Sequence, residues 1–97
     1  MVREVKWTNR ALKDRIQILS YWLTRNKSNS YSLKLDDLFI ETLQSLCKFP
    51  YAGRKTEKRD VRIKVVKNYL LIYRITATRI VILRLWDTRQ NPQKLKY

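Results

Sequence analysis

The sequence predicts an α+β domain in which a helical hairpin packs on one face of a small, mostly antiparallel sheet. Two long stretches carry apolar residues at helical spacing and are joined by a short polar turn. Three strand patterns then follow one another at the spacing of hairpins. The predicted element order is β-α-α-β-β-β, and 97 residues suffice for one such domain, spanning residues 1–97, but not for two cores.

The chain opens with a predicted strand and helix. Residues 2–7 alternate in polarity, which predicts a short strand with Val5 and Trp7 facing inward. Thr8 or Asn9 offers a side-chain oxygen that can cap a helix ending near Arg25. Spacings of four, three and four residues place one apolar stripe on that helix, with Ala11 and Trp22 alongside: Leu12, Ile16, Leu19 and Leu23.

A second amphipathic helix follows the polar turn at residues 25–30. It is predicted to begin near Ser28 to Ser30 and to stop ahead of Pro50, because proline disfavours helical backbone in the residue before it. Its apolar stripe consists of Tyr31, Leu35, Leu38, Phe39, Leu43, Leu46 and Cys47. Two long helices joined by so short a turn pack as an antiparallel hairpin.

The second half of the chain predicts three strands after a glycine-containing loop and a charged connector at residues 55–60. Residues 61–65 alternate strictly between apolar and basic side chains, as a strand with one solvated face requires. Residues 70–75 and 80–86 are almost continuously apolar, which is typical of interior strands. Short turns at residues 67–68 and 76–78 separate the three.

The charge of the chain is large and unevenly distributed. There are 22 Lys and Arg residues against 8 Asp and Glu residues, for a formal net charge of +14. Residues 1–53 carry 9 basic and 5 acidic residues, whereas residues 54–97 carry 13 and 3. Since self-repulsion destabilises a compact fold, this excess predicts a polyanionic partner, nucleic acid or an acidic protein segment, on the strand-rich half. The alternative is a basic surface that serves only solubility.

Several kinds of site are excluded by residues that the chain lacks. It has no histidine and only one cysteine, Cys47, so neither an intrachain disulfide nor a Cys-His nucleophile is available. No structural zinc site and no cofactor are expected. The lone cysteine fits a reducing cytoplasm, and the absence of a long apolar run predicts no membrane contact. A general base would have to be Asp, Glu, Lys or Tyr.

The remaining candidates for function are cations and aromatic residues on the strands. Arg62 and Lys64 share a strand face, and so do Arg84 and Trp86, because residues two apart point the same way. If the strands form a meander, these charges could line one concave surface that holds phosphate. Two alternatives stay open: Arg62 and Lys64 are only solvated, and Arg84 forms an ion pair with Asp87 or with a helix carboxylate.

Several motifs together resemble those of the RelE/ParE superfamily of toxins from bacterial type II toxin–antitoxin modules. The resemblance runs from about Val5 to Arg89 and rests on the order and spacing of the motifs. They are Thr8-x-x-Ala11-x-x-Asp14, the pair Tyr21-Trp22, Phe49-Pro50-x-x-Gly53-Arg54, Tyr69-Leu70-x-x-Tyr73-Arg74, and the last strand Ile80-x-Ile82-Leu83-Arg84. It implies the fold predicted above and a cognate antitoxin whose acidic or amphipathic segment wraps the toxin.

The resemblance also implies one of two toxic activities. RelE-like members cut mRNA on the ribosome without a metal, and ParE-like members inhibit DNA gyrase. By resemblance Arg62 and Lys64 match the basic strand of RelE-like members, and Arg89 matches the arginine just beyond their last strand. With Arg84, which shares the last strand with Trp86, these are the cations predicted to be catalytic. The residues predicted to bind RNA are Arg54, Lys67, Arg74, Trp86 and Lys94. The sequence-based hypothesis is therefore a ribosome-dependent mRNA endonuclease. The alternatives are a gyrase inhibitor and, outside the family, a non-toxic nucleic-acid-binding module.

Three departures from the nuclease pattern bear on that hypothesis. Leu70 stands where RelE-like members have an arginine, and residues 94–96 bring no tyrosine to the tail position expected for one. Glu57 or Tyr97 would have to act as the base. The Phe49-Pro50-x-x-Gly53-Arg54 loop is more similar to ParE-like sequences.

Overall fold

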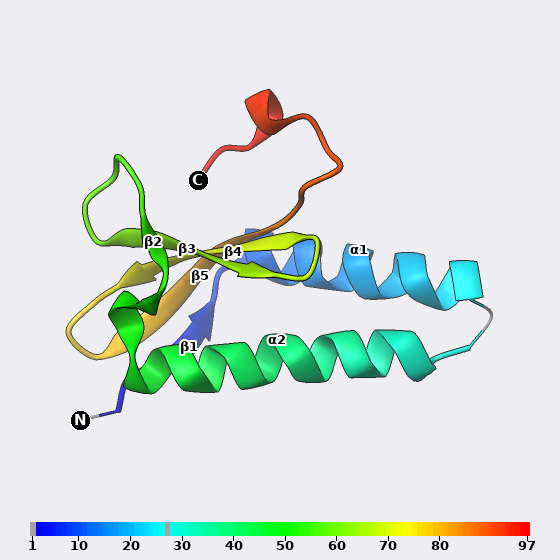
Figure 1. Cartoon of the computed structure of the whole chain (residues 1–97), viewed down its shortest axis with the longest axis horizontal. Coiled ribbons are helices and arrows are strands. Elements are labelled where there is room, and N and C mark those ends of the chain that lie inside the picture. Colours follow the sequence, from blue (N-terminus) through cyan, green and yellow to red (C-terminus); the bar gives the residue numbers. More distant parts are fainter. Residues whose placement is uncertain (1, 27) are drawn as a thin grey trace.

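The computed structural model describes residues 2–26 and 28–97. Two helices, α1 (Asn9–Asn26) and α2 (Ser30–Lys48), pack as a hairpin against one face of a five-stranded sheet (Figure 1). The strands are β1 (Glu4–Trp7), β2 (Arg54–Lys55), β3 (Val61–Val66), β4 (Tyr69–Ile75) and β5 (Arg79–Asp87). Short 3₁₀ turns lie at Pro50–Ala52 and Pro92–Lys94. The predicted α+β class and element order are confirmed; Lys27, in the turn at 25–30, lies outside the described residues.

The sheet has the order β1-β5-β4-β3-β2. The three long strands form the predicted meander, and β1 joins it parallel to β5. β2 was not predicted, because a two-residue strand leaves no periodic signal; it pairs with Ile63 and Arg62 of β3. Between β4 and β5, Ile72 pairs with Arg84 but Tyr73 pairs with Ile82, so that a bulge leaves Leu83 without a partner. No helix in the described part of the chain is long and apolar enough to cross a membrane.

The start of α1 follows the sequence prediction. The hydroxyl Oγ1 of Thr8 accepts a hydrogen bond from the Ala11 N–H at 3.2 Å, which satisfies a donor of the first helical turn. The same hydroxyl donates to the Ile82 carbonyl at 2.8 Å. One side chain therefore caps the helix and ties it to β5.

The buried face of α1 differs from the predicted one. Ala11 and Ile18 are buried, whereas Leu12, Ile16 and Leu23 are 38%, 62% and 44% exposed. Of the two residues placed alongside the stripe, Ala11 is in the core and Trp22 packs against it. The predicted buried stripe of α1 was wrong because the helix carries apolar residues on two sides. Polar contacts determine which of the two sides faces the core. Asp14 and Arg15 must face inward to reach Arg84 and Asp36.

The two isoleucines of α1 provide a direct test of this orientation. We expect Ile18→Ala to lower the free energy of unfolding by about 2–4 kcal/mol, since it leaves a cavity in the core. Ile16→Ala should change it by less than about 0.5 kcal/mol, because Ile16 is mostly in solvent. Urea unfolding of the two variants measures both values. Equal losses, or a larger loss for Ile16→Ala, would favour the stripe predicted from the sequence.

The core lies between α2 and the sheet. The α2 stripe is confirmed at Leu35, Phe39, Leu43, Leu46 and Cys47, while Tyr31 is 37% exposed. Tyr69, Leu71 and Tyr73 of β4 meet this stripe from the sheet. Of the inward residues predicted for β1, Trp7 packs against the core, but Val5 is 37% exposed because β1 lies at the sheet's edge.

The opposite face of the sheet is covered by the C-terminal segment, residues 88–97, which crosses it on the side away from α2 (Figure 1). Arg84 Nη1 donates to the Lys96 carbonyl at 3.0 Å, and Lys58 Nζ bonds to the main-chain oxygen of Tyr97. Trp86 on this face is only 6% exposed. The tail thus completes the burial of a strand that has helices on one side only.

Candidate functional site

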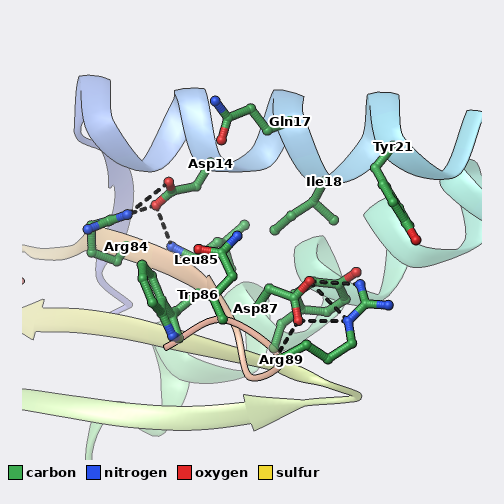
Figure 2. Close-up of a pocket in the computed structure, with 11 residues that line it drawn as sticks. Asp14, Gln17, Ile18, Tyr21, Arg84, Leu85, Trp86, Asp87 and Arg89 are labelled. Atoms are coloured by element: carbon green, nitrogen blue, oxygen red, sulfur yellow. Dashed lines mark hydrogen bonds and ion pairs between the residues drawn. The ribbon is translucent and has the colours of Figure 1, made fainter. Parts of the chain in front are cut away.

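A cavity of about 370 Å³ lies between α1 and the end of β5, and we call it the β5 cavity (Figure 2). β1 pairs with β5 only as far as Ile82, so the later residues of β5 face α1 across this space. Its lining is mainly polar and aromatic: Asp14, Gln17, Ile18, Tyr21, Tyr69, Arg84, Leu85, Trp86, Asp87, Arg89 and Gln90.

Arg84 is held at the end of the β5 cavity by a helix carboxylate. Its Nε lies 2.7 Å from Asp14 Oδ2 and its Nη2 lies 3.2 Å from Oδ1. Asp14 Oδ2 also accepts the Leu85 N–H at 3.1 Å, next to the bulge. The guanidinium lies 5.2 Å from the Trp86 ring, as their shared strand face predicted. Of the alternatives left open for Arg84, the ion pair with a helix carboxylate is the one observed.

Arg89 lies at the outer rim of the same cavity. Its Nη2 is 2.7 Å from Asp87 Oδ2, and its guanidinium lies 5.5 Å and 5.7 Å from the Tyr21 and Trp22 rings. Figure 2 shows the Arg89 and Asp87 side chains meeting near the end of Tyr21. This hydrogen-bonded pair lowers the pKa of the Asp87 carboxyl and raises the pKa of Arg89. Arg89 is therefore a fixed, solvent-exposed cation.

The aromatic wall behind Arg89 connects α1 to the sheet. Trp22 Nε1 donates to the Tyr69 hydroxyl at 2.7 Å. Burial raises the pKa of that Tyr69 hydroxyl, so it stays protonated at neutral pH. The Trp22 ring packs edge-on against Tyr21 and against Tyr31 of α2. The wall was missed from the sequence because Trp22 and Tyr69 are 47 residues apart, although the Tyr21-Trp22 pair itself was noticed.

Arg62 lies in a second cavity, of about 240 Å³, which we call the loop cavity. It is bounded by the connector after β2 and by the start of β3, with Tyr51, Lys55, Thr56, Lys58, Arg59, Asp60, Val61 and Arg62 as its lining. Arg62 Nη1 donates to the carbonyls of Tyr51 and Gly53 at 3.0 Å and 2.9 Å. Lys64 is half-buried on β3 opposite Leu71 and lines neither cavity.

The four cations predicted as catalytic are therefore not gathered on one concave surface. Arg84 and Arg89 line the β5 cavity, whereas Arg62 lines the loop cavity. The residues Arg62 and Lys64 pair with Tyr73 and Leu71, which are core residues on the helix side of the sheet. The twofold periodicity of β3 is confirmed, but the solvated face predicted for its cations is not. Arg62 and Lys64 lie half-buried on the helix side, whereas Val65 on the opposite face is 59% exposed.

The residues predicted to bind RNA are scattered over several elements. Arg54 on β2, Lys67 in the β3–β4 turn, Arg74 on β4 and Lys94 in the tail are all exposed. Trp86 is buried under the tail and does not present a ring face to solvent. Their role in binding stays a prediction. The sequence-based interpretation overlooked Lys55, Lys58 and Arg59, although the charged connector was a visible signal for them.

Comparison with known proteins gives one family and one fold. The model of the family described as "ParE toxin of type II toxin-antitoxin system, parDE" matches residues 5–92. No curated protein matches the sequence. Among solved structures, the chromosomal ParDE TA system from P. aeruginosa superposes with a TM-score of 0.74 at 23% identity, over 89% of this chain and 96% of that one.

A second solved structure is the toxin–antitoxin complex RelBE2 from Mycobacterium tuberculosis. It superposes with a TM-score of 0.59 at 20% identity, over 90% of this chain and 99% of that one. At these identities the two likenesses establish the fold alone. The family match covers most of the sequence, and this chain belongs to the ParE toxin family of type II toxin–antitoxin systems.

Proposed function

We propose that this toxin blocks DNA replication by binding DNA gyrase and that it does not cut mRNA. The sequence had favoured the mRNA endonuclease, with gyrase inhibition as the alternative, and the proposal reverses that preference. The observation that carries it is the ion pair of Arg84. A phosphate clamp would need a free guanidinium at this position, but Asp14 already accepts hydrogen bonds from two nitrogens of Arg84.

Metal-independent cleavage of RNA requires several donors within hydrogen-bonding distance of one phosphate. Arg62 and Arg89 line different cavities, and Leu70 stands where the resemblance expects a third arginine. A nuclease would have to break the Arg84–Asp14 pair and bring these groups together. A protein that only binds its target has no such requirement, and membership of the ParE family supports this interpretation.

The β5 cavity is the docking face that we assign to the target protein. Arginine and tyrosine are the residue types that most often dominate the binding energy of protein interfaces. Arg89 and Tyr21 are exposed at its rim, and Asp87 holds Arg89 in one orientation before binding. A side chain that is already ordered loses less entropy when a partner contacts it.

We also propose a cognate antitoxin with an acidic segment. The net charge of +14 favours such a partner electrostatically. The two similar folds come from toxin–antitoxin assemblies, which supports the same partner class for this chain.

The activity is tested with purified toxin in two assays run side by side. One measures supercoiling of relaxed plasmid by gyrase, and the other maps mRNA ends in a reconstituted translation system. We expect inhibition of supercoiling and intact mRNA. We expect Arg89→Ala to weaken inhibition about tenfold or more, and Lys48→Ala, which removes an exposed cation at the end of α2, to act like the wild type.

Two outcomes would contradict this proposal. Cut mRNA with unaffected supercoiling would restore the endonuclease hypothesis, and an inactive protein in both assays would remove both activities. Inhibition that Arg89→Ala leaves unchanged would show that the target docks elsewhere on the toxin. Thermal unfolding of each variant distinguishes weaker docking from a damaged fold.

A further inference from the structure

The loop cavity concentrates positive charge that no Asp or Glu side chain of the described residues neutralises, although Lys58 Nζ bonds to the main-chain oxygen of Tyr97. One of its lining residues is an acid, Asp60. Four are cations, which we call the loop cations: Lys55, Lys58, Arg59 and Arg62. In the part of the chain that the structure describes, none of the four forms an ion pair with Asp or Glu. Like charges held this close repel one another, so an anion that enters the cavity gains energy from all four.

Arg62 is oriented before any ligand arrives. Two main-chain carbonyls fix its Nη1, and its guanidinium lies 5.0 Å from the centre of the Tyr51 ring. Neither Nε nor Nη2 of Arg62 donates to another described residue in the structure. The Nε–Nη2 edge that remains suits two oxygens of one phosphate, because the N–H groups of a guanidinium and the oxygens of a phosphate match as a fork.

The aromatic neighbours distinguish among possible anions. Tyr51 is 59% exposed although it borders the cavity, and the Tyr97 ring lies 4.9 Å from Lys58 Nζ. Exposed rings beside a row of cations are the arrangement by which proteins bind single strands: the cations contact phosphates while bases stack on the rings. An acidic protein segment would use the cations but would make no use of the exposed side of the Tyr51 ring.

From these contacts we propose that the loop cavity binds the phosphate backbone of single-stranded nucleic acid and that Tyr51 stacks on a base. The strand order β1-β5-β4-β3-β2 separates this cavity from the β5 cavity. One toxin molecule can therefore hold a protein at one site and a nucleic acid strand at the other. This binding does not depend on the gyrase proposal.

The test measures fluorescence anisotropy of short labelled oligothymidylate and oligouridylate as purified toxin is added. We expect the double substitution Lys58→Ala/Arg59→Ala to weaken binding about tenfold and to lower the slope of log affinity against log salt by about 1.4, or about 0.7 for each phosphate that is no longer neutralised. The matched control is Lys13→Ala/Lys34→Ala, which removes two exposed helix cations and the same net charge. It should change binding by no more than about twofold.

A second pair of variants tests the ring. Tyr51→Ala should weaken binding about tenfold, whereas Tyr51→Phe keeps the ring and should bind like the wild type. Equal weakening by the loop and control double substitutions would overturn the proposal, since only net charge would matter. Stronger binding of polyglutamate than of either oligonucleotide would overturn it in favour of an acidic protein. In either case the supercoiling result stands separately, because that assay reports on the β5 cavity.

Discussion

Replacing Asp14 with alanine should lower the free energy of unfolding by about 3–5 kcal/mol. The Asp14 and Arg84 side chains are only 12% and 9% exposed, so the substitution leaves a buried guanidinium without its counter-ion. It also removes the acceptor for the Leu85 N–H at the bulge. The arginine would have to recruit water or pull away from the strand, and α1 would lose its polar attachment to β5.

Urea unfolding provides the measurement, and the chain contains its own control. Asp36 pairs with Arg15 through the same bidentate geometry, but those side chains are 22% and 24% exposed. Asp36→Ala should therefore cost about 1 kcal/mol or less. The double variant Asp14→Ala/Arg84→Met should recover much of the loss, because it removes the unpaired charge. Losses of similar size at Asp14 and Asp36 would show that burial does not distinguish the two pairs.

Gly53→Ala should destabilise the protein by about 3 kcal/mol, combining overpacking with broken hydrogen bonds. The backbone at Gly53 is extended, with φ of −76°, so conformational strain is not the reason. A Cβ there would lie 2.5 Å from the Tyr73 hydroxyl oxygen and 3.0 Å from Tyr73 Cε1 and the Ile63 carbonyl. Tyr73 is fully buried and cannot move aside easily.

The same hydroxyl is anchored on both sides, which makes the clash specific. Tyr73 donates to the Pro50 carbonyl at 2.7 Å and accepts from the Gly53 N–H at 3.0 Å. Tyr73→Phe alone should cost about 1–3 kcal/mol by leaving those groups unpaired. The double variant Gly53→Ala/Tyr73→Phe should be clearly more stable than the sum of the single effects, since removing the hydroxyl makes room for the methyl. If the two single losses of unfolding free energy simply add, the clash between the methyl added at Gly53 and the Tyr73 hydroxyl is ruled out. Ala52→Ser, at an exposed neighbouring position, is the control and should leave the free energy of unfolding unchanged.

These two sites show why a motif residue of this family can be found in the sequence although the sequence does not reveal what the residue does. Asp14 and Gly53 both belong to the motifs that suggested the superfamily. One neutralises a buried arginine 70 residues away, and the other makes room for a tyrosine 20 residues away. Both contacts depend on how β4 and β5 are placed against other elements, and no local periodicity encodes that placement.

The sequence by itself determined the order of the helices and the long strands, the meander, a cap for α1 at Thr8 or Asn9 and most of the buried stripe of α2; the structure selected Thr8 as the cap. Each of these follows from local chemistry: apolar spacing, a capping hydroxyl, or a proline that ends a helix.

Only the tertiary structure decided which side of α1 is buried, because two apolar sides compete and the ion pairs of Asp14 and Arg15 select one. It also separated Arg62 from Arg84 and Arg89, since strand pairing and the bulge at Leu83 set the face that each cation takes. Charge and composition had indicated a polyanionic partner for the strand-rich half. Where on that half two distinct sites could form depended on pairing between residues far apart in the chain.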